Sequence, residues 1–328
     1  MAETILVTGG AGYIGSHISK ALALSGYVPV VYDNLLSGHR ELVRWGEFVH
    51  GDICDYTALS LAMRCHNISG VVHCAALAYV GESIANPDAY YHTNVTGPLN
   101  VLRAMQACGV SKIVVSSSCA VYGHADGAPI TEDTPLQPIS PYGFTKFVME
   151  RMLDDFDMAY SVRSAALRYF NAAGADADAD CGEWHTPETH LVPRIVMTAL
   201  GRIPELHIFG NDYPTPDGTC IRDYVHVTDI AQAHVNAMRY LSEGKPSCKV
   251  NLGTGRGYSI KELVDAAEAM FQKKIPCVIH PRRAGDPAAL VADARYARTL
   301  LQWMPVCSSL DAILATGMRF TQSFIGHD

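Results

Sequence analysis

The chain has 328 residues, of which 48% are hydrophobic and 18% are charged, and its formal net charge is −8. This composition is typical of a folded α/β protein, and the length suits one large domain with a smaller lobe. The chain is acidic and has no marked basic run, so neither a nucleic acid nor an acidic membrane is expected as a partner. No apolar run approaches the roughly 18 residues of a membrane helix.

The ten cysteines form no Cys-x-x-Cys pair, and no spacing of cysteine and histidine resembles a zinc site, so we expect no metal. Free thiols fit a reducing cytosol. The sequence begins directly with a predicted strand and offers no signal peptide. These features together predict a cytoplasmic protein.

The first predicted strand, residues 4–8, runs into a glycine-rich turn and then into a helix near residues 14–25. Gly9 permits the tight turn, Gly12 lets a pyrophosphate approach the backbone, and Gly15 allows the helix to pack close to the strand. Free N–H groups and the positive end of the helix dipole would then face the phosphates. The segment predicts a dinucleotide site; the alternative is a tight loop without a ligand.

Two acidic residues follow the next two predicted strands. Asp33 comes after residues 28–32, where a carboxylate can accept both adenosine ribose hydroxyls and would repel a 2′-phosphate. NAD is therefore favoured over NADP. Asp52 follows a short strand at residues 47–50, and it can either bond the adenine amino group or cap a helix.

Two further strands, at residues 71–74 and 112–117, continue the alternation of strands with helices. Their apolar runs lack two-residue alternation, as expected when helices cover both faces of a parallel sheet. The sequence therefore predicts an α/β fold built on a doubly wound, Rossmann-type parallel sheet.

A Tyr-x-x-x-Lys pair, Tyr142 and Lys146, is the main candidate for catalysis, because residues four apart share one face of a helix. A nearby ammonium favours the phenolate and lowers a tyrosine pKa that is ordinarily about 10. Ser118 follows the strand at residues 112–117, at the end of the sheet where ligands bind. Its hydroxyl can bridge a substrate oxygen and the phenol. The alternatives are an amphipathic helix with one exposed lysine and a serine-rich turn.

The second half of the sequence is less regular. Residues 172–221 are rich in Asp, Gly and Pro and are expected to form surface loops around short helices. The later predicted elements are a helix at residues 226–244, a strand at 249–252 and a helix at 259–271.

Two units are expected from this organisation. Residues 1–171 would form the NAD-binding Rossmann domain, with return segments near residues 222–252. Residues 172–328 would form a smaller C-terminal lobe that binds the substrate.

A set of short motifs extends over nearly the whole chain. They are Thr-Gly-Gly-Ala-Gly-Tyr-Ile-Gly-Ser-His at 8–17, Val-Gly-Glu-Ser at 80–83, Ser-Ser-Ser-x-x-Val-Tyr-Gly at 116–123, Ser-Pro-Tyr-Gly-x-x-Lys at 140–146, Leu-Arg-Tyr-Phe-Asn at 167–171, Ile-Phe-Gly-Asn-Asp-Tyr-Pro at 208–214 and Gly-Thr-Cys-Ile-Arg-Asp-Tyr at 218–224. Together they resemble the UDP-glucose 4-epimerase family of extended short-chain dehydrogenases. The resemblance implies interconversion of UDP-glucose and UDP-galactose by transient oxidation at C4 with bound NAD, in a homodimer.

The resemblance also implies roles for individual residues. Ser118, Tyr142 and Lys146 match the catalytic serine, base and lysine. The implied cofactor contacts are Gly9, Gly12, Tyr13, Ile14, Gly15, Asp33, Asn34, Asp52, Ile53, Asn94, Tyr142, Lys146 and Tyr169. The implied UDP-sugar contacts are Ser118, Tyr142, Asn171, His190, Leu191, Phe209, Arg222, Arg283, Asp286 and Leu290. The two arginines can supply the forked donors that a pyrophosphate needs.

Three positions depart from the best-known bacterial pattern. Ala78 stands where a lysine can assist the cofactor, and His190 replaces an amide residue near the uridine-diphosphate site. Leu290 stands where a bulky tyrosine limits the sugar pocket in some members. A smaller residue leaves more room, so UDP-N-acetylhexosamines are retained as further substrates.

Other functions stay open on this fold. The related sugar-nucleotide 4,6-dehydratases carry Asp-Glu directly after the catalytic hydroxyl residue, whereas this chain has Cys119 and Ala120. A UDP-pentose or UDP-uronate 4-epimerase would differ only at the rim of the pocket. A non-enzymatic NAD-binding regulator would not need Tyr142 or Lys146.

Overall fold

The computed structural model describes residues 2–123, 129–283 and 286–324. Its main element is a seven-stranded parallel sheet in the order β11-β6-β5-β4-β1-β2-β3. The strands are β1 (Thr4–Thr8), β2 (Val28–Asp33), β3 (Glu47–His50), β4 (Gly70–His73), β5 (Lys112–Ser118), β6 (Arg163–Tyr169) and β11 (Cys248–Leu252). The predicted doubly wound α/β fold is confirmed.

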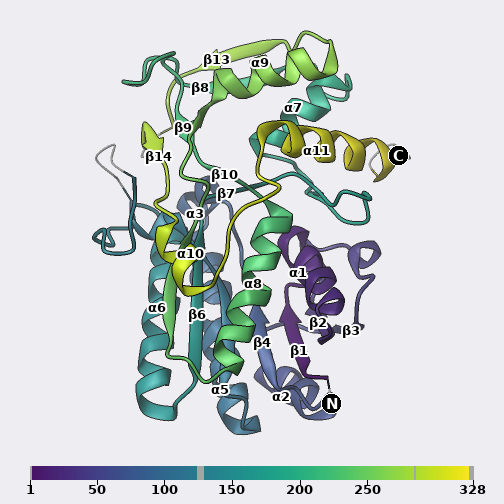
Figure 1. Ribbon diagram of the computed structural model, residues 1–328, viewed down its shortest axis with the longest axis vertical. Coiled ribbons are helices and arrows are strands. Elements are labelled where there is room, and N and C mark those ends of the chain that lie inside the picture. The colour runs from purple at the N-terminus through teal and green to yellow at the C-terminus, as the bar shows by residue number, and fades with distance from the viewer. Residues whose placement is uncertain (1, 124–128, 284–285, 325–328) are drawn as a thin grey trace.

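Helices cover both faces of this sheet (Figure 1). They are α1 (Tyr13–Leu24) and α8 (Val227–Ser242) on one face, and α2 (Tyr56–Cys65), α5 (Gly97–Cys108) and α6 (Pro141–Tyr160) on the other. Ile5 and Val7 of β1 pack on the first face and Leu6 packs on the second, because successive side chains of a strand point to opposite sides. All three are fully buried, which explains the continuous apolar run.

The connection from β4 to β5 contains several short helical pieces. They are α3 (Val80–Ala85), α4 (Pro87–Tyr91) and a π-helical turn at His92–Thr96 that continues into α5. Such π turns are rare and occur frequently at functional sites. The turn faces α6, so it brings this connection against the helix that carries Tyr142.

A smaller lobe lies at the end of the main sheet opposite the N-terminus (Figure 1). Its core is formed by α7 (Leu191–Ala199), β8 (Leu206–Phe209), α9 (Ile260–Phe271), β13 (Cys277–His280) and α11 (Leu310–Phe324). The short sheets are β7 (Asn171–Ala173) with β10 (Tyr224–His226), and β9 (Ile221–Arg222) between β12 (Tyr258–Ser259) and β14 (Ala289–Leu290). The remaining elements are η1 (Arg40–Leu42), η3 (Cys119–Val121) and α10 (Arg295–Leu300).

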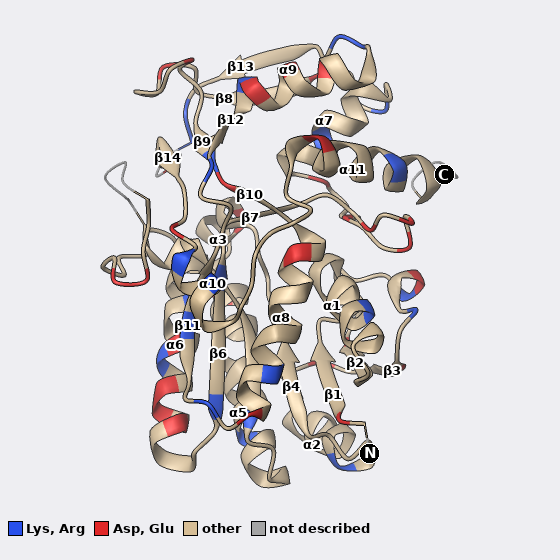
Figure 2. Ribbon diagram, viewed as in Figure 1, with Lys and Arg blue, Asp and Glu red and all other residues tan. Residues whose placement is uncertain are grey.

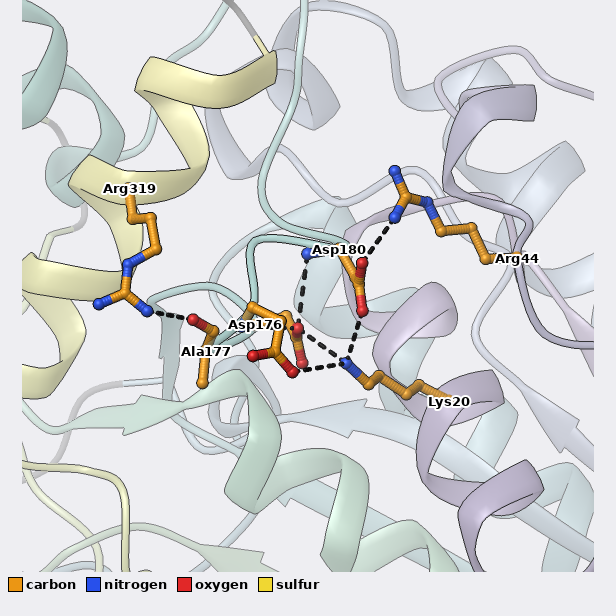
Figure 3. Close-up of polar contacts among 7 residues, drawn as sticks. Lys20, Arg44, Asp176, Ala177, Asp180 and Arg319 are labelled. Atoms are coloured by element: carbon orange, nitrogen blue, oxygen red, sulfur yellow. Dashed lines mark hydrogen bonds and ion pairs between the residues drawn. The ribbon is translucent and has the colours of Figure 1, made fainter.

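The Ala-Asp repeat at residues 175–180 is not a free surface loop. Lys20 of α1 lies 2.8 Å from Asp176 and 3.0 Å from Asp180, and Arg44 lies 2.6 Å from Asp180 (Figure 3). Asp176 is buried, and it also accepts hydrogen bonds from the backbone of the same loop. The expected loop is present and Ala177 and Asp178 are exposed, but Asp176 is buried because a lysine on a distant helix pairs with the carboxylates of this stretch.

Acidic and basic residues are interspersed along α6 and α9 in the view of Figure 2. Within the described residues, we find no helix with both the length and the apolar character to cross a membrane.

Candidate active site

The glycine turn joins β1 to α1 in a conformation that side chains would disrupt. Gly9 has a φ of +72°, and a Cβ atom on it would lie 2.6 Å from the backbone nitrogen of Ala75. A Cβ on Gly15 would lie 2.1 Å from the carbonyl oxygen of Gly9. Gly12 is the N-cap of α1 and offers no side-chain cap. The first-turn amides therefore stay available for an anion.

Tyr13 and Ile14 begin α1 but point into the protein. The Tyr13 hydroxyl donates a 2.6 Å hydrogen bond to the carbonyl of Gly174, which follows β7. Ile14 packs against the core on the α1 face of the sheet. Their side chains hold the helix in place, so their contacts to a cofactor would come from the backbone.

Asp33 ends β2 beside the glycine turn. Its carboxylate accepts hydrogen bonds from the backbone of Ala11, at 3.0 Å, and of Leu35, at 2.8 Å. Burial raises the pKa of Asp33, and these hydrogen bonds partly offset the rise. The carboxylate is thus held at the edge of the turn, where an adenosine ribose would lie in a dinucleotide site.

Asp52 and Asn34 lie together at the ends of β2 and β3. The Asn34 amide donates to Asp52 at 3.0 Å, and the backbone of Cys54 donates to it at 2.7 Å. Although burial acts in the opposite direction, these bonds lower the pKa of Asp52. Asp55, and not Asp52, is the N-cap of α2, so the alternative of a helix cap at Asp52 is wrong. The Ile53 side chain lies in the core.

Asn94 lies in the π turn and is buried. Its side chain exchanges two 2.9 Å hydrogen bonds with the backbone of Leu77 and donates to Thr145 at 3.2 Å. Both amide hydrogens are therefore used within the protein. Asn94 ties the loop after β4, including the exposed Ala78, to the helix that carries Tyr142.

The start of α6 is set by local sequence. Ser140 is the N-cap and accepts a 3.1 Å hydrogen bond from the backbone of Gly143, and Pro141 occupies the first helical position. A Cβ on Gly143 would lie 2.5 Å from the carbonyl oxygen of Ala120. The helix therefore approaches the segment after Ser118 closely, with Tyr142 in its first turn.

Ser118, Tyr142 and Lys146 come together at the carboxyl end of β5, and all three are buried. The Lys146 ammonium donates a 2.8 Å hydrogen bond to the carbonyl of Ser116 and lies 5.9 Å from the Tyr142 ring. Tyr169 ends β6 directly beside Ser118 in the sheet register. The prediction that these residues form one site is thus consistent with their placement.

The electrostatics of this group differ from the expectation. Burial raises the pKa of Tyr142 to about 12, against the opposing effect of a hydrogen bond from Ser118. Burial also lowers the pKa of Lys146 to about 8, although Cys74 and Glu150 act in the other direction. The expected fall in the Tyr142 pKa is therefore wrong for the protein alone, because desolvation outweighs a cation placed 5.9 Å from the ring.

A buried polar network below the site has no counterpart in the sequence predictions. The Arg168 guanidinium donates to Glu150 at 2.9 and 2.5 Å and to the Tyr122 hydroxyl at 2.8 Å. Ser117 also donates to Glu150, at 2.5 Å. Glu150 lies one helical turn beyond Lys146, so the network fixes α6 on the sheet. Arg168, a charged residue that directly follows the apolar run Ala-Ala-Leu at 165–167, is the sequence feature that could have indicated this network.

Several predicted substrate contacts meet at the short sheets of the lobe. Arg222 of β9 is buried, pairs with Asp286, and lies beside Leu290 of β14 in the sheet register. The Arg283 guanidinium lies 4.1 Å from the centre of the Phe209 ring. The structure therefore gathers these residues into two arginine-containing clusters.

The other predicted substrate contacts line a small cavity between β7 and α7. Asn171, His190 and Leu191 all contribute to its wall. Burial opposes the charged form of His190, but the carboxylates of Glu183 and Glu188 raise its pKa to about 10. His190 is therefore an electropositive group at the start of α7.

The sheet, the glycine turn with Asp33, and the Ser-Tyr-Lys group define a dinucleotide-dependent enzyme of the short-chain dehydrogenase type. Residues 5–253 match the NAD dependent epimerase/dehydratase family, and the chain belongs to that family. The resemblance inferred from the motifs is confirmed by relatives over nearly the full length.

One such relative is the UDP-glucose 4-epimerase of Rhizobium leguminosarum bv. trifolii, 49% identical over 303 residues, which are 92% of this chain and 93% of the relative. The UDP-glucose 4-epimerase of Lacticaseibacillus casei is 45% identical over 321 residues, covering 98% and 97% of the two chains. The crystal structure of UDP-glucose 4-epimerase from Brucella ovis in complex with NAD is 50% identical, has a TM-score of 0.95, and matches 97% of this chain and 98% of its own.

Proposed function

We propose that this chain interconverts UDP-glucose and UDP-galactose by transient oxidation of the sugar at C4 with bound NAD. The observation that carries the proposal is the buried group of Ser118, Tyr142 and Lys146, held at the same edge of the sheet as the glycine turn. Relatives at 45–49% identity that bear the name UDP-glucose 4-epimerase support the particular substrate.

The residues present fit NAD. The uncapped N-terminus of α1 suits a pyrophosphate, and the Asp33 carboxylate suits ribose hydroxyls while disfavouring a 2′-phosphate. Asn34 and Asp52 would hold the adenine side, and Lys146 with Tyr169 the nicotinamide side. Bound NAD supplies a hydride acceptor for C4 and a positive ring near Tyr142.

In the proposed reaction Tyr142 takes the proton of the sugar 4-hydroxyl, and Ser118 bonds the same oxygen. Lys146 stabilises the phenolate by its charge. Arg222 and Arg283 hold the pyrophosphate while the 4-keto sugar turns its other face to the site. Tyr142 then returns the proton to the oxygen of the inverted centre. The net redox change is zero, so the cofactor is retained through turnover.

The proposal also assigns a different ligand to each of the two units. Residues 1–171, with return segments near residues 222–252, would bind NAD, and residues 172–328 would hold the UDP-sugar. Strand β11, which lies beside β6 in the main sheet, supports the return segment. Leu290 lies beside Arg222 in the sheet register and is smaller than a tyrosine, which supports the proposal that UDP-N-acetylhexosamines are also accepted.

A cytoplasmic homodimer is likewise proposed. The ten cysteines lie in described parts of the chain and are free, which suits a reducing compartment. Exposed Phe144, Met158 and Tyr160 on α6 offer apolar surface for a second copy.

The residues directly after Ser118 disfavour the dehydratase alternative. Cys119 and the apolar Ala120 stand where the related dehydratases carry Asp-Glu, so the carboxylate pair that elimination across C5 and C6 uses there is missing from these two positions.

Incubation of the purified protein with UDP-galactose, without added NAD, tests the proposal. UDP-glucose should accumulate to equilibrium. A 4-keto-6-deoxy product would instead identify a dehydratase, and the absence of any product would favour the NAD-binding regulator. Parallel assays with UDP-N-acetylglucosamine, UDP-xylose and UDP-glucuronate would define the range of sugars and test the UDP-pentose and UDP-uronate alternatives.

A further inference from the structure

A mixed cluster of carboxylates and imidazoles lies in the segment that joins β7 to α7. Its members are Glu183, His185, Glu188 and His190, and one ligand atom from each lies within 4.8 Å of the others. The two glutamate side chains are only 7% and 6% exposed. Two buried carboxylates side by side need a compensating positive charge.

The ion pairs of these glutamates, within the described residues, are with the two histidines and not with a lysine or arginine. A second carboxylate group within the described residues is different. There the Lys20 ammonium lies 2.8, 3.8 and 3.0 Å from Asp176, Asp178 and Asp180, so a lysine is the counter-ion (Figure 3 shows Lys20, Asp176 and Asp180). Of these two groups, the Glu-His cluster is the one that offers both nitrogen and oxygen ligands.

Three of the distances inside the cluster are longer than charge-assisted hydrogen bonds. Nδ1 of His185 lies 3.4 Å from Oε1 of Glu183 and 3.4 Å from Oε2 of Glu188. Nδ1 of His190 also lies 3.4 Å from Oε1 of Glu188. A charge-assisted N–H···O bond spans about 2.7–2.9 Å. Nδ1 of His185 is fully buried and has no hydrogen-bond partner in the described part of the chain.

A spacing of 3.4 Å suits ligands that share a metal ion. Nitrogen and oxygen ligands about 2.0–2.1 Å from a tetrahedral zinc ion stand about 3.4 Å from each other. One pair is closer: His190 Nδ1 lies 2.6 Å from Oε1 of Glu183, at ion-pair distance. Binding of an ion would replace this contact by two metal–ligand bonds.

The surroundings orient the ligand atoms. Oε1 of Glu188 accepts hydrogen bonds from the backbone of Thr189, at 2.7 Å, and of His190, at 2.8 Å. These bonds turn the other oxygen of Glu188 toward His185. The Tyr79 ring stacks on His190 at 5.4 Å and meets His185 edge-on at 5.8 Å. Such outer contacts fix the ligands of metal sites.

We propose that Glu183, His185, Glu188 and His190 form a structural site for one divalent transition metal ion of the zinc class. Two imidazoles and two carboxylates match the ligand preferences of zinc, and four protein ligands leave no open position for catalysis. The earlier expectation of no metal considered only cysteine and histidine spacings, whereas the ligands here follow Glu-x-His-x-x-Glu-x-His. The ion would fix the wall of the cavity that His190 and Leu191 form with Asn171.

Zinc titration of the chelator-treated full-length protein tests the proposal. We expect one equivalent of zinc per chain after gel filtration, by elemental analysis, and a rise in melting temperature of about 2–4 °C for each tenfold excess over Kd. His185→Gln and Glu188→Gln should each weaken zinc binding by at least about 10–100-fold. His207→Gln is the matched control, because His207 also lies 3.4 Å from a glutamate but outside the cluster.

Two results would overturn the site: wild-type protein that takes up no zinc, or His185→Gln protein that retains it fully. The histidines would then act only as counter-ions of the glutamates. X-ray absorption of zinc-loaded wild type gives a check that needs no variant. Nitrogen and oxygen ligands at about 2.0–2.1 Å support the site. Sulfur ligands at about 2.3 Å would show that cysteines bind the zinc and would refute it. Metal content does not depend on turnover, so the zinc measurement can be interpreted even if the proposed epimerase reaction is not observed.

Discussion

Tyr142 occupies surroundings that oppose its ionisation. Burial raises its pKa to about 12, and the nearby Lys146 bonds the Ser116 carbonyl instead of the phenol. Added positive charge close to the ring would lower this pKa and favour the phenolate, which is the form that acts as a base.

Tyr142→Phe removes the proton path and little else, because the ring stays buried in the same place. Turnover of UDP-galactose should fall by about 10²–10⁴-fold, while the NAD content of the purified protein is unchanged. A variant with near-normal turnover would exclude Tyr142 as the acid and base.

Lys146→Met removes the cation beside the phenol. The phenolate is the reactive form, so the rate rises with pH toward the pKa of Tyr142, and loss of the cation moves that rising limb to higher pH. The profile of kcat against pH measures the shift. If kcat is lower at every pH but the rising limb stays at the same pH, Lys146 acts only by positioning other groups.

Local chemistry predicted some site residues well and others poorly. Tyr142 and Lys146 share a helix face by their spacing alone, and Gly15, expected to let the helix pack close to the strand, packs against Gly9 and Gly10 of the turn that follows β1. The role of Asp52 needed the structure, because only folding shows that Asp55 caps α2. The Tyr142 pKa was misjudged because burial depth is a property of the packed molecule.

Arg168 and Glu150 link two neighbouring elements, β6 and α6, below the active site. Their side chains are only 3% and 2% exposed, and they form a bidentate pair. Tyr122 accepts a further hydrogen bond from Arg168, and Ser117 donates one to Glu150. Removal of one partner leaves the other buried without compensation.

Arg168→Met should lower the free energy of unfolding by about 3–5 kcal/mol. Urea denaturation followed by circular dichroism measures the change. Arg151→Met is the control, because Arg151 and Asp155 form an exposed pair on the same helix, and it should change stability by less than about 1 kcal/mol. Equal effects of the two variants would contradict the role of the buried network.

Gly15→Ala tests the junction between β1 and α1. The added methyl would meet the Gly9 carbonyl at 2.1 Å, so the helix must move and the turn must open. Overpacking of this kind costs about 1–3 kcal/mol. NAD content should fall together with the melting temperature. Gly81→Ala in α3 has no atom within 4 Å of the new methyl and should leave both unchanged.

The elements themselves were largely predictable. The strand at residues 4–8 matches β1 and the strand at 47–50 matches β3, because continuous apolar runs between turns are typical of parallel strands. The lobe was not predictable in detail, since β9, β12 and β14 are two-residue strands whose pairing depends on contacts distant in sequence. The Glu150–Arg168 pair likewise depends on how α6 packs on β6.

The two units of the molecule are joined by polar contacts from α1. Lys20 pairs with Asp176 and Asp180, and Tyr13 bonds the carbonyl of Gly174 (Figure 3 shows Lys20). The helix that begins at the glycine turn thereby holds the loop that leads to the cavity between β7 and α7. How well that loop is ordered should therefore depend on Lys20, which lies outside the lobe.

Lys20→Met should loosen the loop at residues 174–190, because buried Asp176 loses its counter-ion at a cost of about 1–3 kcal/mol. We expect faster cleavage of this loop in limited proteolysis and a higher KM for UDP-galactose, with little change in kcat. Lys245→Met changes an exposed lysine elsewhere and serves as the control. Unaltered proteolysis of Lys20→Met would show that the loop is held by other contacts.

The order of the strands also bears on how the chain is made. Val114 and Leu167, in the middle of the sheet, are covered by Val235 and Met238 of α8, which the ribosome produces well after residue 171. A nascent chain that ends near residue 171 would expose this apolar surface and lack strand β11 at the edge. Stable folding should therefore begin only when synthesis has passed about residue 252, and arrested nascent chains shorter than that should bind chaperones.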